Sequence, residues 1–182
     1  KLNLTDREFN TNSNTLFIRT AKASAIDRTD GFISSGTGSL VRTTASTDKY
    51  LFPVGSSMGE LRYRPVEIRP ATSIVQQSSV SFVPKNPTTD GFDVNSKSEN
   101  IISINTEFYH IVKGVNPLDI SIFFDDADGP FDNIAQWSKI KAQWKSVGIS
   151  GLNLNIPGLT SLEIFNTPNV KPWVFALAEI GI

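Results

Sequence analysis

Leu118-Asp119-Ile120-Ser121-Ile122-Phe123-Phe124 is the stretch that decides the fold of this chain. Its apolar residues at 118, 120, 122 and 124 fall on alternate positions, so they share one face of an extended backbone. Ile and Phe side chains also fit the pleated, half-buried surface of a strand. We therefore predict a strand here, with one face packed against a core.

The same signal repeats outward from this stretch. Residues 61–69 alternate as well, and Pro65 and Pro70 confine that strand to an edge or to a strand end. Residues 84–100 are polar and predict a long loop or a hairpin of weak strands. Short apolar runs recur about every 8–15 residues between Gly, Pro, Asn and Asp turns. This favours an all-β fold, an antiparallel β-sandwich resembling a jelly roll, formed by residues 1–182 as a single module.

Two interpretations stay open for residues 132–147. Ile134, Trp137, Ile140 and Trp144 lie at nearly helical spacing, which predicts one short helix. The rival interpretation is two strands, each centred on a tryptophan and separated by a turn. A helix here would be the only one in the fold.

Composition excludes several classes of protein. Hydrophobic residues make up 39% of the 182, which suits a packed core and argues against disorder. The net charge of −1 lacks the basic balance of nucleic-acid-binding domains, so we expect no nucleic-acid partner. No apolar run approaches the roughly 20 residues that span a bilayer, so we expect no membrane insertion. Lys1 begins directly in strand-like sequence without a signal peptide, which predicts a piece excised from a larger protein.

Catalytic motifs are missing from the sequence. The chain has no cysteine, which excludes disulfides, thiolate nucleophiles and cysteine zinc sites. His110 is the single histidine and cannot build a multi-histidine metal site. A Ser-His-Asp arrangement needs a serine on a strained turn, and no Gly-x-Ser-x-Gly occurs. Gly36-Thr37-Gly38 is not followed by the Lys of a phosphate loop. We therefore predict no catalytic residues and no enzyme.

Four carboxylates crowd the segment that follows the strand at 118–124. They are Asp125, Asp126, Asp128 and Asp132, which lie within eight positions. Carboxylates this close repel one another unless water or a cation neutralises them, and Ca²⁺ takes six to eight oxygen ligands from such loops. The order Asp126-x-Asp128-Gly129 is similar to the opening of a calcium loop, but no Glu stands at position twelve. Either these four residues bind calcium, with no cofactor otherwise required, or they form a solvated turn in which Asp132 caps a helix.

Two kinds of side chain are candidates for carbohydrate binding. Exposed aromatic rings stack on sugars, and guanidinium groups bind anionic glycans. The candidates are Trp137, Trp144, Tyr63, Arg62 and Arg64. The alternatives are core packing for the aromatic residues and surface ion pairs with Glu60 and Glu67 for the arginines.

Motifs along the chain occur in a distinctive order. Phe52-Pro53-Val54-Gly55 precedes Tyr63-Arg64-Pro65-Val66. The segment 30–42, ending in Leu-Val-Arg, comes before them, and aromatic-rich segments at 107–111 and 134–137 come after. Together these segments resemble internal modules of large surface and secreted proteins of Bacteroidetes, which the type IX secretion system exports and which include gliding-associated adhesins. The resemblance covers roughly residues 2–177 and carries across no catalytic residue and no ligand.

The resemblance implies an extracellular or cell-surface location and a multidomain context. We therefore expect a non-catalytic structural or adhesion module of a bacterial surface or secreted protein, with neighbouring domains of the same chain as partners. The alternative is a carbohydrate-binding module, stabilised by calcium and accessory to a secreted hydrolase, whose partner would be a glycan or a surface polymer.

Overall fold

The computed structural model describes residues 1–115, 117–147, 156, 158–167 and 172–181. Its strands are β1 (Leu2–Asn3), β2 (Glu8–Asn10), β3 (Thr15–Ile18), β4 (Ile26–Asp27), β5 (Phe32–Ser34), β6 (Ser39–Thr44), β7 (Tyr50–Phe52), β8 (Gly55–Ser56), β9 (Arg62–Tyr63), β10 (Val66–Pro70), β11 (Gln76–Val83), β12 (Ile101–Ile104), β13 (Tyr109–Lys113), β14 (Leu118–Phe124), β15 (Asn133–Ser138), β16 (Gln143–Val147), β17 (Thr160–Ile164) and β18 (Trp173–Ile180). Three short 3-10 helices join them: η1 (Ala23–Ala25), η2 (Pro87–Asp90) and η3 (Asp126–Asp128). The prediction of an all-β chain is confirmed. No helix among these residues is long and apolar enough to cross a membrane.

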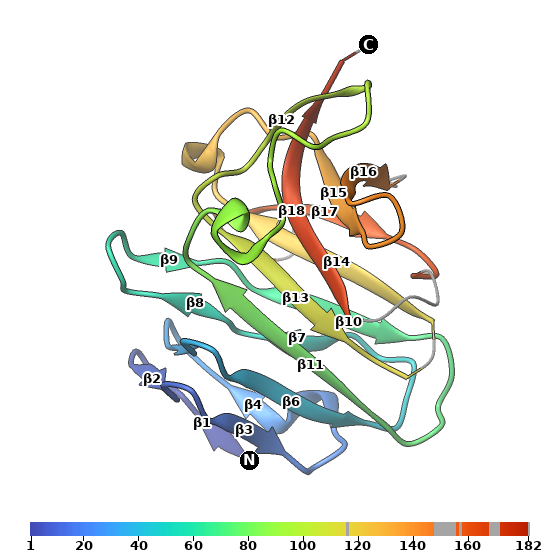
Figure 1. Cartoon of the computed structure of the whole chain (residues 1–182). Helices are drawn as coiled ribbons and strands as arrows, with labels where there is room; N and C mark the ends of the chain where they lie inside the picture. The colour runs from blue at the N-terminus through green and yellow to red at the C-terminus, as the bar shows by residue number, and fades with distance from the viewer. Residues whose placement is uncertain (116, 148–155, 157, 168–171, 182) are drawn as a thin grey trace.

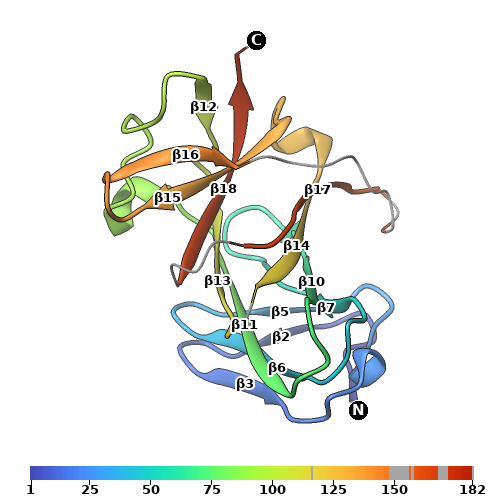
Figure 2. The ribbon, with the colours of Figure 1, turned by 90° about the vertical axis from the view of Figure 1, so that its right-hand side faces the viewer.

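Two sheets form the body of the molecule as a β-sandwich (Figures 1 and 2). The smaller sheet has the strand order β17-β14-β10-β7 and is antiparallel throughout. The larger, eight-stranded sheet runs β16-β15-β18-β13-β11-β6-β3, with β12 also pairing with β18. Its strands are antiparallel from β16 to β6. The predicted antiparallel β-sandwich is therefore present.

Strand β14 supplies the centre of the core, as its alternation predicts. Leu118, Ile120 and Ile122 are each at most 1% exposed, and Phe124 is 3% exposed. Within the small sheet, Ile120 lies opposite Ile68 of β10. These residues belong to one apolar cluster that reaches into the larger sheet, so both sheets share one core.

The outer face of the larger sheet is also covered in part. The segment 84–100 has η2 as its only regular structure and crosses this face as a long loop, as predicted. Its Phe92 and Val94 pack on a second apolar cluster that contains Trp144. The loop also pairs with β16, because the Trp144 backbone N–H donates to the Ser96 carbonyl at 2.7 Å.

The prediction of a helix at 132–147 is wrong, and the rival interpretation of two strands separated by a turn is confirmed. Strands β15 and β16 form a hairpin in which Trp137 lies opposite Trp144. Ile134 faces the main core while Trp137 packs on the second cluster, so these side chains leave opposite faces of one sheet. Ile140, which the helical pattern placed on the apolar face, is 88% exposed at the turn. The helical spacing of these four apolar residues is therefore coincidental.

The first 44 residues form two stacked coils, which the sequence analysis did not predict. Strands β1, β2 and β3 pair in parallel with β4, β5 and β6, and each partner lies 24 positions further along the chain (2 with 26, 8 with 32, 15 with 39). A constant offset over three successive strand pairs is the pairing of a β-solenoid. We call residues 2–18 the first coil and residues 26–42 the second coil.

Two glycines allow the coils to approach closely. A Cβ added at Gly38 would lie 2.0 Å from the Asn14 carbonyl oxygen, and one at Gly31 would lie 2.6 Å from that of Arg7. Neither distance is tolerable, so the second coil requires glycine where the first carries Arg and Asn. The Thr5 carbonyl oxygen sits at one corner and accepts three backbone N–H groups, from residues 29, 30 and 31.

Arg42 joins the second coil to the β-sandwich. Its side chain is fully buried, and Nη2 donates to the carbonyl oxygens of Lys22 at 3.0 Å and Ala23 at 2.7 Å. Nη1 donates to the Leu51 carbonyl of β7 at 2.5 Å, and the guanidinium lies 5.2 Å from the Tyr50 ring centroid. Burial lowers the pKa of Arg42 to about 10, against an opposing effect of Tyr50. One guanidinium on β6 thus holds two other backbone segments, at Lys22–Ala23 and at Leu51.

The central position of Ile122 makes it the test of the core. We expect Ile122→Ala to lower the free energy of unfolding by about 2–5 kcal/mol, because it leaves a cavity between the two sheets. Ile102→Ala is the matched control, since Ile102 is 56% exposed and its loss should cost within about 0.5 kcal/mol. Urea unfolding measures both, and equal losses would contradict the placement of the core.

Candidate functional site

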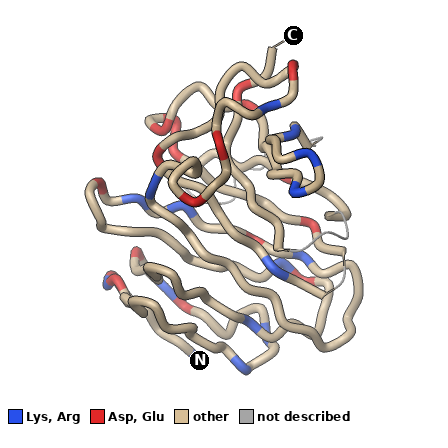
Figure 3. The backbone as a smooth tube through the Cα atoms, viewed as in Figure 1, with Lys and Arg blue, Asp and Glu red and all other residues tan. Residues whose placement is uncertain are grey.

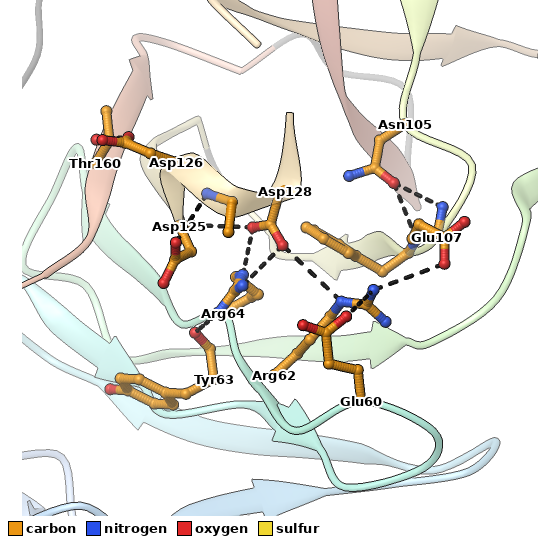
Figure 4. A network of polar contacts seen from close by, with 12 residues as sticks. Glu60, Arg62, Tyr63, Arg64, Asn105, Glu107, Asp125, Asp126, Asp128 and Thr160 are labelled. Carbon is orange, nitrogen blue, oxygen red and sulfur yellow. Dashed lines mark hydrogen bonds and ion pairs between the residues drawn. The ribbon is translucent and has the colours of Figure 1, made fainter. Parts of the chain in front are cut away.

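A buried ion pair between Arg64 and Asp128 is the centre of an extended polar network (Figure 4). Arg64 Nη2 donates to Asp128 Oδ1 at 2.7 Å, and Arg64 Nε donates to Oδ2, so the pair is bidentate. The two side chains are 8% and 4% exposed. Arg64 Nη1 donates in addition to the Tyr63 carbonyl at 2.9 Å. Planar bidentate pairing of this kind fixes both orientation and distance.

The chain brings these two residues together at one end of the smaller sheet, where β10 begins beside the end of β14. Arg64 lies between β9 and β10, whereas Asp128 ends η3 in the turn that follows β14. Asp128 Oδ2 also accepts the Asp125 backbone N–H at 2.9 Å, and Asp125 Oδ1 accepts the Ala127 N–H, which together form a capping box. The capping box therefore shapes the turn at residues 125–128, the acidic turn, so that the Asp128 carboxylate points inward at the Arg64 guanidinium.

Arg62 extends the network towards solvent. Its Nη2 lies 2.7 Å from Glu60 Oε2 and 3.6 Å from Glu107 Oε2, and its Nε lies 3.9 Å from Asp128 Oδ1. Both glutamates are more than 60% exposed. Ion pairs with exposed partners contribute about 0–1 kcal/mol, so the outer part of the network adds little stability.

Phe108 and His110 form the floor of the network. The guanidinium carbons of Arg62 and Arg64 each lie 6.0 Å from the Phe108 ring centroid, at the limit of cation–π attraction. His110 is fully buried, and its Nε2–H donates to the Arg64 carbonyl at 2.9 Å. Burial lowers the pKa of His110 to about 4, so this ring is neutral at pH 7. Asn105 Oδ1 accepts the backbone N–H groups of Glu107 and Phe108, and this shapes the approach to β13.

The four predicted calcium ligands point to four different places. Asp128 bonds to Arg64, and Asp125 caps η3. Asp126 Oδ1 accepts the Thr160 hydroxyl at 3.0 Å, and Asp132 Oδ1 accepts the Ile180 backbone N–H at 3.1 Å. Within the described residues no group of three or more His, Asp or Glu side chains gathers around one point. The calcium hypothesis stays a prediction, and the carboxylates as placed here do not converge.

The candidate sugar-binding aromatics are separated as well. Trp144 is fully buried, and its Nε1 donates to the Phe92 carbonyl at 3.3 Å. Trp137 is half-buried and meets Trp144 and Phe92 edge to face, with ring centroids 5.4 and 5.6 Å apart. Tyr63 lies elsewhere, under the Arg28 guanidinium at 4.0 Å. Burial raises the pKa of Tyr63 to about 12, against the opposing charge of Arg28. The three rings therefore form no common platform.

The arginine candidates are engaged in ion pairs, as the alternative interpretation stated in part. Arg62 does pair with Glu60, but Glu67 lies beside Lys49 at 3.6 Å rather than beside an arginine. The partner that sequence reasoning missed is Asp128, which is 64 positions from Arg64. A single sequence holds no signal for a pairing at that distance.

Acid–base chemistry needs a proton donor or acceptor at the wall of a cavity. One described depression, of about 450 Å³, does hold a carboxylate, Asp119. Its Oδ2 already accepts a hydrogen bond from Arg69 Nη2 at 2.6 Å, and its Oδ1 accepts one from the Asn166 backbone N–H at 3.0 Å. Acidic and basic residues are otherwise interspersed over the molecule (Figure 3). The Asp119 carboxylate thus links β14 to Arg69 of β10 and to Asn166 after β17.

Comparisons with known proteins give no relative for this arrangement: no family model, no curated protein and no solved structure matches the chain.

Asp128→Asn tests the ion pair. We expect it to lower the free energy of unfolding by about 3–5 kcal/mol, because a buried guanidinium loses its only bidentate partner among the described residues. Asp126→Asn in the same turn is the matched control and should cost less than about 1 kcal/mol, since Asp126 is exposed and accepts one hydroxyl. Chemical denaturation at pH 7 compares them, and similar losses would mean that the turn rather than the pair is what matters.

His110 gives the fold a specific pH dependence. The ring has a pKa near 6.5 when unfolded and about 4 when folded, so the unfolded chain binds a proton that the folded chain refuses. The contribution of His110 to the free energy of unfolding is therefore complete above about pH 6.5, and it falls by about 3 kcal/mol as the pH drops to 4. His110→Phe should flatten this part of the profile, whatever its effect at neutral pH. The free energy of unfolding measured from pH 4 to 7.5 decides, and parallel profiles would contradict the assignment.

Proposed function

We propose that the chain is a non-catalytic structural or adhesion module of an extracellular or cell-surface bacterial protein. The observation that carries this proposal is that the ionisable residues considered as candidates form hydrogen bonds inside the fold. Asp128, Arg64 and Arg42 bond inside the fold to each other or to backbone carbonyls, and His110 is buried and bonded to a carbonyl. Side chains used in this way stabilise a shape and are not free to bind or convert a substrate.

The shape itself supports a role as a spacer. Strand β1 and the end of β18 lie at opposite ends of the molecule in both views (Figures 1 and 2). Domains joined at these two ends would be held apart by the full length of the β-sandwich. The hydrogen bonds of the two buried arginines, Arg42 and Arg64, would keep that spacing rigid, because each arginine links segments that are distant in the sequence.

Labelling of intact cells tests the location. We expect antibodies raised against the purified module to label unpermeabilised cells that produce the full-length protein, and brief treatment with external protease to remove the label. An antibody to a cytoplasmic protein is the control for cell integrity. Labelling that requires permeabilised cells would overturn the extracellular assignment.

A screen of the purified module for turnover and for glycan binding tests the non-catalytic part. We expect no hydrolysis of glycan, ester or peptide substrates. Turnover that is lost in Glu107→Gln or Asp119→Asn would overturn the proposal. Binding on a glycan array that is lost in Trp137→Ala, or a melting temperature that falls on chelation of Ca²⁺, would favour a calcium-stabilised carbohydrate-binding module instead.

A further inference from the structure

The outward edge of the first coil is unpaired. Among the described residues, β1 pairs only with β4, β2 only with β5, and β3 only with β6. We call the free side of these three strands the open edge. Its backbone N–H and C=O groups have no strand beside them, and such an edge is a template for a further strand.

Two large apolar side chains of the first coil are far less buried than their counterparts in the second. Phe9 is 45% exposed, whereas its register partner Ile33 is 1% exposed. Phe17 is 50% exposed, whereas its partner Val41 is 9% exposed. Ile33 and Val41 have neighbours on both sides, because Ile33 also bridges to Val54 and Val41 also pairs with Ser79. The first coil has a neighbour on one side only.

The surface of the first coil is also hollowed. A depression of about 310 Å³ is lined entirely by residues of this coil, from Phe9 to Leu16, around the corner between β2 and β3. The strands beside it contain neither Lys nor Pro, the residues that most often block an exposed edge. A hollow that places Phe9 and Leu16 among Asn and Thr side chains, next to unblocked strands, suits a partner that brings backbone hydrogen bonds together with some apolar side chains.

We propose that the open edge binds a further parallel coil of about 24 residues, supplied by a preceding segment of the same polypeptide. In a solenoid the order of stacking follows the order of the chain, so the coil that lies on β1, β2 and β3 is the one whose end joins Lys1. The fixed offset of 24 positions sets the register, and Leu2, Phe9 and Leu16 mark where its apolar residues rest. The inference rests on the proposed function only in that both require a multidomain polypeptide.

The corners of the first coil restrict how the added coil is shaped. Arg7 and Asn14 occupy the positions that are Gly31 and Gly38 one coil later, where a Cβ would lie 2.6 and 2.0 Å from a carbonyl oxygen. A coil added to the open edge must therefore turn wider corners and make its contacts along the strands. Identical stacking of corner on corner is excluded.

A fusion protein tests the proposal with a defined probe. Residues 1–24 are duplicated ahead of the complete chain, so that the copy enters with the required offset of 24, and Thr5→Gly, Asp6→Gly, Asn12→Gly and Ser13→Gly in the copy widen its corners. We expect the amides of the native Thr15–Ile18 strand that point away from β6 to exchange with solvent at least about tenfold more slowly than in the parent chain.

The matched control is the same fusion with Leu2→Ser, Leu4→Ser, Leu16→Ser and Ile18→Ser in the copy, which should give no protection. A second version of the fusion replaces Arg7→Gly and Asn14→Gly in the native coil, in case the native corners are too tight. Protection in the first fusion, and not in the control, supports the proposal. Protection in neither version, or only in the version with glycine corners, overturns it.

Sedimentation of the parent chain completes the test. We expect a monomer at all concentrations, because a coil in this register comes from the same polypeptide. A dimer that disappears on Phe17→Lys would mean that a second copy occupies the open edge and would overturn the choice of occupant. Amide exchange reports only on the edge and surface labelling only on location, so failure of one proposal is distinguishable from failure of the other.

Discussion

A buried guanidinium must be surrounded by oxygen atoms, and this constraint organises the molecule. An unsatisfied charge inside a protein is so costly that the segments which supply its acceptors cannot move away. Arg42 takes its acceptors from the backbone of Lys22, Ala23 and Leu51, whereas Arg64 takes a carboxylate, Asp128. Each arginine therefore decides where a whole stretch of chain lies on the β-sandwich. The core between the sheets supplies the stability, and the arginines supply the placement.

The two arginines serve different parts of the fold. Arg42 adds to the other contacts between the coils and the sandwich, which include the pairing of β6 with β11 and the bridge from Ile33 to Val54. Without Arg64 the Asp128 carboxylate would lose its bidentate partner and keep, among the described residues, only the Arg62 guanidinium as a cation, at 3.9 Å. The network around Arg64 also accounts for the sole histidine, which supports the Arg64 carbonyl from below as a neutral donor. Arg64, Asp128 and His110 are thus bonded to one another or to the backbone in the fold.

The sequence predicts the parts of this fold that depend on neighbours along the chain. The alternation at 118–124 gave the right strand and the right buried face, because a strand in a two-layer fold has one face towards the core. The coils were missed because all of their strands except β6 have only two to four residues, too few positions for a period to show. The helix at 132–147 was wrong because both faces of that hairpin are covered, which hides the alternation of a strand. Asp128 and Arg64 each stood out as candidates, but only the fold could make them partners.

The last strand of the chain occupies the middle of the larger sheet. Strand β18 (Trp173–Ile180) lies between β13 and β15 and also pairs with β12. Three strands that precede it in the sequence therefore lack a neighbour until β18 is in place. During synthesis or export the apolar faces of those strands would remain open until residues 173–180 are available. Contacts between residues so far apart in sequence also make folding slow. The larger sheet is therefore completed only when β18 has joined β12, β13 and β15, and until then their unpaired edges are exposed to aggregation.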